Sequence, residues 1–479
     1  MDRKSFLQKS ALGYSGLVAS GLAINPMEQP SIPSDLKITD IRAVVLAANF
    51  DYSIIKIYTN QGVVGLGEVR DAGWPAQALI AKPFLIGKNP LDIENILKSI
   101  SHLTGQGRFG GGYSAIDIAL MDIAGKVLGV PCWQLLTINN ANPRGRRQKV
   151  HEQIPCYSDT IGTQNVQVYR ERMQRRLDMG YQNFKMDLYL SLFRGIEGCV
   201  LTDSTNVVGN VVTEKGLQVW GEHVLRIRDL IGYKVKLGAD HFGRIDAKSG
   251  IALGNFMADS QYSLAYIEDV VDFFLPNAVN LNRQITAGSQ TPTLGFEDIF
   301  GFETFKSYIE QGAMAIIHPD PLTAGGMIES KKIAEYAALY GIPTMFHNAG
   351  SPVGTMAMVH TAATITPFIS LENHFLEMPW WEDIITGIEK PILRKGGVIN
   401  VPDTPGLGIE LNEEVIKEHI REASFLPYNP GFFEPTPMFD RPISMREALM
   451  KGIIGDFKVG GPWWHINDDG VYANQTGQR

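Results

Sequence analysis

The chain has 479 residues, of which 44% are hydrophobic and 20% are charged, and this is enough for one large domain or two ordinary ones. The formal net charge of −8 and the lack of a Lys/Arg block argue against a nucleic-acid-binding protein. Cys132, Cys156 and Cys199 lack zinc-ligand spacing and cannot build a disulfide framework, so we expect them to be small buried side chains.

The first 30 residues have the layout of an export signal. A basic start, with Arg3, Lys4 and Lys9, precedes an apolar run that is too short for a stable transmembrane helix. The segment RKSFL at 3–7 resembles a twin-arginine signal in which lysine replaces one arginine. We therefore expect an exported, periplasmic protein without membrane insertion, with an ordinary secretory signal or a cytoplasmic location as the alternatives.

Three further regions follow the signal. Residues 37–150 predict an α+β domain, because β-branched runs predict three strands over 37–71 and helical spacing of apolar residues predicts helices over 91–136. Residues 151–400 alternate strand-like runs with amphipathic helices, which indicates parallel strands in a barrel or an open sheet. Residues 401–479 are expected to pack back on the front domain or on a neighbouring subunit.

Five consecutive strand-like runs end in an ionisable residue, at intervals of about one βα unit: Asp240, Glu268, Glu297, Asp320 and His347. In a parallel α/β barrel the C-terminal strand ends form the rim that carries the active site. An open sheet would instead concentrate its ligands at one switch point. The regular series of ionisable strand ends therefore favours a barrel.

The run FKMDLYL places Lys185 and Asp187 on the same face of a strand. Two charges that point into a barrel are costly unless they are paired or used. Residues 190–215 lack a clean helical period, and we expect an insertion there that contributes to substrate specificity.

These residue types suit proton abstraction beside a metal. Asp240, Glu268 and Glu297 supply the oxygen ligands that Mg²⁺ prefers, and without a cation three converging carboxylates would repel one another. Asp320 can fix the tautomer of His347 and make it a general base. The alternatives are that the carboxylates are solvated loop residues or helix caps and that the histidine is structural.

Several segments resemble the enolase superfamily, in its mandelate racemase / muconate lactonizing enzyme branch. They are GGGYSAIDIALMDIAGKVLGVPCWQLL in the front domain and HPDPLTAGGMIES, FHNAGSPVG and PGLGIEL in the second half, and the resemblance runs from about 37 to 412. It implies an α+β capping domain over a (β/α)7β barrel. It also implies Mg²⁺ on Asp240, Glu268 and Glu297, a His347–Asp320 dyad, and abstraction of the proton α to a carboxylate.

The chain departs from that family pattern at two places. Racemases of the family carry Lys-x-Lys on the second barrel strand, whereas Asp187 occupies the second position here and leaves Lys185 as an electrostatic partner or an acid/base. A two-base racemase is therefore not expected. The segment EDVVD lacks the proline often found after the glutamate, so Asp269 competes with Glu268 for the ligand position.

Two more acid/base candidates come from the resemblance. The segment GADHFGRID is similar to one in galactonate and mannonate dehydratases, where a histidine is the leaving-group acid, which makes His241 a catalytic candidate. Strand alternation turns His241 away from Asp240, which favours a structural role. Glu372 is the candidate for a carboxylic acid that contacts the enolate or the substrate carboxylate, and Glu377 is its rival.

Substrate contacts are expected from two places. Arg70 and Trp74 follow the strand GLGEV, where the capping loop of this family meets the substrate. Trp380 and Trp381 offer flat faces for sugar stacking, or they are packing residues.

The expected function is a Mg²⁺-dependent dehydration of a sugar acid to a 2-keto-3-deoxy acid by a homo-oligomeric lyase. The leaving-group acid would be His347 itself or His241. A cycloisomerase or epimerase that uses the same enolate is the first alternative. A secreted carbohydrate-binding barrel without catalysis is the second.

Overall fold

A computed structural model describes residues 35–137, 148–160, 166–201, 209–241, 243–422, 428–443 and 447. The predicted export segment lies outside these residues, as do parts of the expected insertion near 190–215 and of the C-terminal segment. Within the described part of the chain, no helix has the length and apolar character needed to cross a membrane.

The front domain is a three-stranded antiparallel sheet with helices beside it. The strands, in the order β1-β2-β3, are β1 (Ile38–Leu46), β2 (Tyr52–Thr59) and β3 (Val64–Val69). The helices are α2 (Ala76–Leu79), α3 (Lys82–Leu85), α4 (Ile93–Ile100), α5 (Gly111–Leu128) and α6 (Cys132–Leu136). A Cβ atom on Gly65 or Gly67 would lie 2.1 Å from a carbonyl oxygen of α5, so these two glycines allow α5 to pack directly on β3.

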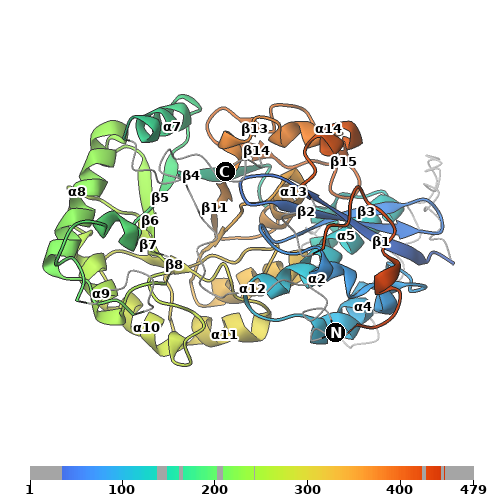
Figure 1. The fold of residues 1–479 in the computed structure, drawn as a ribbon, viewed down its shortest axis with the longest axis horizontal. Helices are drawn as coiled ribbons and strands as arrows, with labels where there is room; N and C mark the ends of the chain where they lie inside the picture. The colour runs from blue at the N-terminus through green and yellow to red at the C-terminus, as the bar shows by residue number, and fades with distance from the viewer. Residues whose placement is uncertain are drawn as a thin grey trace, which may run out of the picture. The chain divides into compact units, whose positions relative to one another are not determined.

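Eight parallel strands form a closed barrel, because the last strand pairs with the first. The strands are β4 (Gln153–Thr160), β5 (Asn183–Asp187), β6 (Lys236–Asp240), β7 (Tyr266–Glu268), β8 (Thr293–Gly295), β9 (Ile316–Ile317), β10 (Thr344–Phe346) and β11 (Phe368–Asn373). In the described residues the helices between successive strands are α7 (Val166–Asp178), α8 (Glu214–Ile231), α9 (Ala247–Phe256), α10 (Ala278–Gly288), α11 (Phe302–Glu310), α12 (Gly326–Leu339) and α13 (Pro352–Ala362). Figure 1 shows α7 to α11 outside the strands. The predicted (β/α)7β barrel with an N-terminal α+β capping domain is confirmed.

Local sequence signals explain where several barrel helices begin. The Thr213 hydroxyl accepts the Gly216 N–H at the start of α8, and the Asp246 carboxylate accepts two N–H groups at the start of α9. Ser351 caps α13, which continues with Pro352 in its first turn. Every residue of α13 is buried, because this helix packs between barrel strand β11 and cap strand β3.

Short elements follow the barrel. They are β12 (Ile385–Thr386), β13 (Leu393–Arg394), β14 (Val398–Asn400), β15 (Glu410–Leu411) and α14 (Glu413–Glu418). The 3-10 turns along the described chain are η1 (Ser101–Leu103), η2 (Gly107–Gly110), η3 (Leu190–Phe193), η4 (Phe375–Glu377), η5 (Trp381–Ile384) and η7 (Pro437–Phe439). The described C-terminal residues contact the cap: Arg421 pairs with Asp51, and the Phe433 N–H donates to the Ala43 carbonyl at 3.2 Å.

Buried carboxylates of the cap join it to the barrel. Glu68 on β3 accepts the Ser351 N–H at 2.8 Å, the Ser351 hydroxyl at 2.6 Å and the Gly354 N–H at 2.8 Å, at the start of α13. Asp117 on α5 accepts the Met327 N–H at the start of α12. These contacts satisfy helix N-terminal donors that would otherwise be buried without partners.

Candidate active site

The predicted site residues stand at the C-terminal rim of the barrel. Lys185 lies in β5, Asp240 and Glu268 end β6 and β7, and Glu372 lies near the end of β11. Glu297, Asp320 and His347 follow β8, β9 and β10 in the loops just beyond these strands. Parallel strands bring their carboxyl ends to one side of the barrel, so residues far apart in sequence meet there.

Lys185 is the centre of one group of charges. Its Nζ lies 2.7 Å from Glu372 Oε1, 3.3 Å from Glu268 Oε2 and 3.6 Å from Asp240 Oδ2. All four side chains are buried. Burial alone would lower the pKa of Lys185, but the charges of Glu268 and Glu372 outweigh it and hold the pKa well above the usual range. Lys185 is therefore a permanent cation at the rim.

His347 and Asp320 form the predicted dyad. The distance from His347 Nδ1 to Asp320 Oδ2 is 2.7 Å, and His347 Nε2 lies 3.3 Å from Glu297 Oε2. Because a carboxylate can only accept, Nδ1 carries a hydrogen and the tautomer of the neutral ring is fixed. Burial lowers the pKa of His347, but the charges of Glu297 and Glu372 outweigh this and raise it to about 9.

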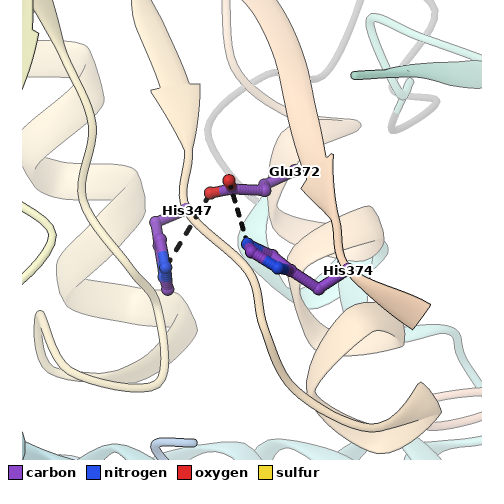
Figure 2. A group of neighbouring side chains, drawn as sticks. All are labelled: His347, Glu372 and His374. Atoms are coloured by element: carbon purple, nitrogen blue, oxygen red, sulfur yellow. Dashed lines mark hydrogen bonds and ion pairs between the residues drawn. The ribbon is translucent and has the colours of Figure 1, made fainter. Parts of the chain in front are cut away.

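Glu372 lies between Lys185 and His347, and Figure 2 shows it beside His347 and His374. Its Oε2 lies 3.8 Å from His347 Nε2, while its Oε1 contacts Lys185 and, at 3.1 Å, His374 Nε2. Burial would raise the pKa of this carboxyl, but Lys185 and His347 hold it well below the usual range. Its rival from the sequence, Glu377, instead pairs with buried Arg176 at 2.9 Å.

The three predicted metal ligands form an electrostatic group. Burial and the charges of Glu268, Asp269 and Glu297 raise the pKa of Asp240 well above its usual range. Glu268 Oε2 is buried without a hydrogen-bond partner among the described residues, although Lys185 lies nearby. Oxygen atoms of Glu268 and Glu297 and a nitrogen of His318 all lie within 4.8 Å of one another. Clustered carboxylates with an orphan oxygen fit a hard divalent cation.

Asp269 and Glu268 point in different directions. Asp269 has a positive φ of 46°, and its Oδ1 accepts the Phe296 N–H at 3.3 Å beyond β8. Glu268 instead faces Lys185 and His318, with His318 Nδ1 2.9 Å from its Oε1. The contacts therefore favour Glu268 over Asp269 as the residue that faces the rim.

Arg70 carries many charge contacts from the cap to the rim. Its guanidinium is fully buried and contacts four acidic side chains: Asp71 at 3.0 Å, Glu297 at 2.8 Å, Asp298 at 2.9 Å and Asp320 at 3.5 Å. The guanidinium therefore orients both Glu297 and the aspartate of the dyad. A direct contact of Arg70 with substrate would compete with these ion pairs.

The tryptophans differ in their surroundings. Trp74 is half-buried, and its indole N–H has no hydrogen-bond partner in the described chain. Trp380 is half-buried and stacks on His419, with ring centroids 4.1 Å apart. Trp381 is buried, stacks on Phe375 and donates to the Gly350 carbonyl at 3.2 Å. Trp381 is thus a packing residue, and Trp74 and Trp380 keep one exposed part each.

His241 and Asp187 occupy places beside the charge group. The ring of His241 packs edge-on against Trp220 of α8, and its Nδ1 lies 3.2 Å from the Glu268 carbonyl. Burial lowers the pKa of His241 to about 4. Asp187 is buried and hydrogen-bonds to Tyr189, and burial together with the charge of Asp187 raises the pKa of that tyrosine well above its usual value.

Sequence reasoning missed two histidines of the rim. His318 lies between Glu268 and the Tyr157 hydroxyl, which is 2.7 Å from its Nε2. His374 lies between Glu372 and Asp159. Each stands two positions from a residue that the sequence did identify, in the segments HPD and ENH. Period-two alternation of strand side chains could have indicated both.

Comparison with known proteins identifies the family. Residues 40–137 match the mandelate racemase / muconate lactonizing enzyme N-terminal domain, and residues 168–415 match the enolase C-terminal domain-like family. The chain belongs to the mandelate racemase / muconate lactonizing enzyme family of the enolase superfamily.

Named relatives of this family member are dehydratases. A D-xylonate dehydratase of Haloferax volcanii is 29% identical over 399 residues, which cover 82% of this chain and 91% of the relative. A D-galactonate dehydratase family member of Musicola paradisiaca is 27% identical over 421 residues, covering 81% and 94%. The crystal structure of a mandelate racemase/muconate lactonizing enzyme-like protein from Rubrobacter xylanophilus has a TM-score of 0.71 at 25% identity, covering 81% and 98%. This mandelate racemase / muconate lactonizing enzyme family member is accordingly an enzyme, and its relatives favour a lyase, with an isomerase as the alternative.

Proposed function

We propose that the protein dehydrates a sugar acid to a 2-keto-3-deoxy acid. The observation that carries the proposal is the joint placement of an Asp320-held His347 and a buried Lys185 on either side of Glu372. An imidazole with a fixed tautomer can accept a proton, and a fixed ammonium can stabilise the negative charge that results.

His347 is the proposed base. Its Nδ1 is occupied by Asp320, so Nε2 is the atom that would take the proton from the carbon α to the substrate carboxylate. Arg70 contributes by holding Asp320 and Glu297 in place. The α-proton is weakly acidic, so the base needs a site that stabilises the enolate strongly.

Lys185 and Glu372 would face the reacting acid together. Lys185 supplies positive charge to the enolate, and Glu372 is held in place by Lys185 and His374. Asp187, in place of a second lysine, leaves one side of the site without an ammonium base, which favours elimination over racemisation.

Asp240, Glu268 and Glu297 would hold Mg²⁺. When bound, the cation supplies positive charge to the developing enolate and offsets Glu297, whose charge otherwise helps to keep His347 protonated. The donor set of buried carboxylates, with an orphan oxygen on Glu268, supports this assignment.

The test uses the acids that the relatives' names suggest as probes. Purified full-length protein is incubated with Mg²⁺ and D-xylonate or D-galactonate, and 2-keto acid is detected with semicarbazide while NMR in D₂O follows the α-proton. Formation of a 2-keto-3-deoxy acid is expected. Exchange of the α-proton with a product of unchanged mass would point to an isomerase, and binding without exchange would overturn the catalytic proposal.

Two further proposals concern the protein as a whole. The basic and apolar composition of residues 1–30 supports export to the periplasm, which fractionation of cells with a C-terminally tagged full-length chain would test. Assembly into a homo-oligomer is proposed as well, and light scattering coupled to gel filtration measures it.

A further inference from the structure

His374 lies at the rim immediately beside the proposed base. Its Nε2 is 3.1 Å from Glu372 Oε1, and its Nδ1 is 3.3 Å from Asp159 Oδ2. The centroids of the His374 and His347 rings are 6.2 Å apart. Figure 2 shows the two imidazoles on either side of the Glu372 carboxylate.

Two residues of the cap contact His374 at the strand ends. The Asn49 side chain donates to the His374 carbonyl at 3.2 Å, and the Phe50 ring meets the imidazole edge-on at 5.3 Å. The side chain of His374 is 10% exposed, whereas that of Glu372 is fully buried. His374 therefore stands where cap and barrel meet, the place at which this fold binds its ligands.

The ring nitrogens of His374 have different surroundings. Because the Glu372 carboxylate can only accept, Nε2 is a donor. Nδ1 is buried and has no hydrogen-bond partner in the described chain, although Asp159 is close enough to favour a positive ring. Burial lowers the pKa of His374, but Asp159 and Glu372 outweigh it and raise the pKa above its usual value. A protonated ring carries a hydrogen on each nitrogen, with Nε2 toward Glu372 and Nδ1 toward Asp159.

A metal site explains this group less well. Ligand atoms of His347, Glu372 and His374 lie within 4.8 Å of one another, which would suit a cation. However, the Lys185 ammonium already lies 2.7 Å from Glu372, and His347 Nδ1 is occupied by Asp320. Glu372 is thus already engaged by a cation, whereas a proton on His374 is stabilised by two carboxylates.

We propose that His374 is the general acid that protonates the departing β-hydroxyl, a role that rests on the dehydratase function proposed above. Base and acid are on neighbouring strand ends, β10 and β11. The role requires each ring to lie within about 3 Å of a different one of two adjacent substrate carbons or its hydroxyl. His241, the earlier candidate, packs instead against Trp220.

His347 and His374 together accept and donate every proton that the reaction requires. In the first step His347 takes the α-proton, the bond from the β-carbon to its hydroxyl breaks, and His374 gives a proton so that water leaves. In the second step the enol becomes a ketone: the former β-carbon takes the proton from His347, and the enol hydroxyl returns a proton to His374. Both histidines end in their initial states.

The test separates the acid from the base by changing the leaving group. His374→Gln keeps an N–H for Glu372 but has no proton to give. We compare D-xylonate or D-galactonate, whichever the wild type dehydrates, with its 3-deoxy-3-fluoro analogue. A hydroxyl group needs a proton to leave as water, whereas fluoride leaves as an anion and needs no acid. Dehydration is expected to fall about 10²–10⁴-fold, while fluoride release and α-proton exchange in D₂O fall much less.

Equal losses with both leaving groups and in exchange would mean that His374 only positions Glu372, and they would overturn the inference. Unchanged dehydration would do the same. If His374→Gln does not fold, Asp159→Asn removes one charge that favours the protonated ring, and it should shift the ratio of the two eliminations in the same direction.

The matched control is His102→Gln, because His102 is an exposed histidine of the cap far from this group in the chain. It should leave the ratio of the two eliminations unchanged. A wild type that is inert toward both natural acids would overturn the proposed function itself. A wild type that dehydrates but shows no change of ratio in the His374 variants would overturn only the acid assignment.

Discussion

Two regions of the protein bury carboxylates completely, but they do so with different partners. At the barrel rim, Glu268 and Glu372 face Lys185 and histidine rings from other strands. At the junction of cap and barrel, Glu68 and Asp117 face backbone N–H groups at the starts of α13 and α12. All four side chains have no solvent exposure.

This contrast means that burial alone does not identify a reacting group. Burial raises the pKa of both Glu68 and Asp117 to about 7, which on its own would be typical of a catalytic acid. The groups that donate hydrogen bonds to Glu68 and Asp117 are backbone N–H groups at helix starts, so these two carboxyls join the cap to the barrel. At the rim the partners are ionisable side chains, which can exchange protons and hold an anionic substrate.

Removal of divalent metal should produce the largest effect and act on the rim alone. Treatment with EDTA is expected to abolish dehydration, because the enolate would lose most of its charge stabilisation. Added Mg²⁺ should restore it, and circular dichroism should show an unchanged fold throughout. Full activity after exhaustive chelation would contradict the ligand role of Asp240, Glu268 and Glu297.

Replacement of the base should come next. His347→Asn retains an amide that can donate to Asp320 but removes the proton acceptor, so we expect turnover to fall about 10²–10⁴-fold. Kinetics and α-proton exchange measure the loss, and the melting temperature reports on the fold. Turnover close to that of the wild type would remove His347 from the mechanism.

A matched change at the domain junction should act on stability instead. In Glu68→Gln the amide nitrogen cannot accept the Gly354 N–H, which would stay buried without a partner at a cost of about 1–3 kcal/mol. Chemical denaturation measures the free energy of unfolding, and kcat of the folded variant should change little. A large loss of kcat without loss of stability would break the distinction between the two regions.

Per pH unit, the smallest effect is the pH dependence at the same residue. Burial raises the pKa of Glu68 in the folded protein to about 7, so the native state binds a proton that the unfolded chain releases at lower pH. The contribution is therefore present below the unfolded pKa and is lost as pH rises toward 7, at most about 1.4 kcal/mol per pH unit.

Comparing the wild type with Glu68→Gln measures this pH-dependent contribution of Glu68 to stability. Denaturation at pH 5, 6 and 8 should show the stability advantage of the wild type shrinking as pH rises. An advantage that grows with pH would mean that the helix N-terminal donors keep Glu68 ionised and that its pKa is not raised.

Local sequence patterns were sufficient to predict the barrel and most residues of its rim. The strand-helix alternation and the ionisable ends from Asp240 to His347 follow from local patterns, since each strand carries its own hydrophobic run and its own polar end. Those patterns state which residues reach the rim. They do not state which residues pair there, and they left Glu377 as a rival of Glu372.

The pairings of the rim residues depend on contacts between different strands and between the barrel and the cap. In the folded protein Glu377 pairs with Arg176, and His241 packs against Trp220. Arg70 pairs with acidic side chains, and His374 lies between Glu372 and Asp159. The physical reason is that a side chain's pKa and partners depend on groups from other strands and from the cap, which become neighbours only when the barrel closes between β11 and β4 and the cap docks on it.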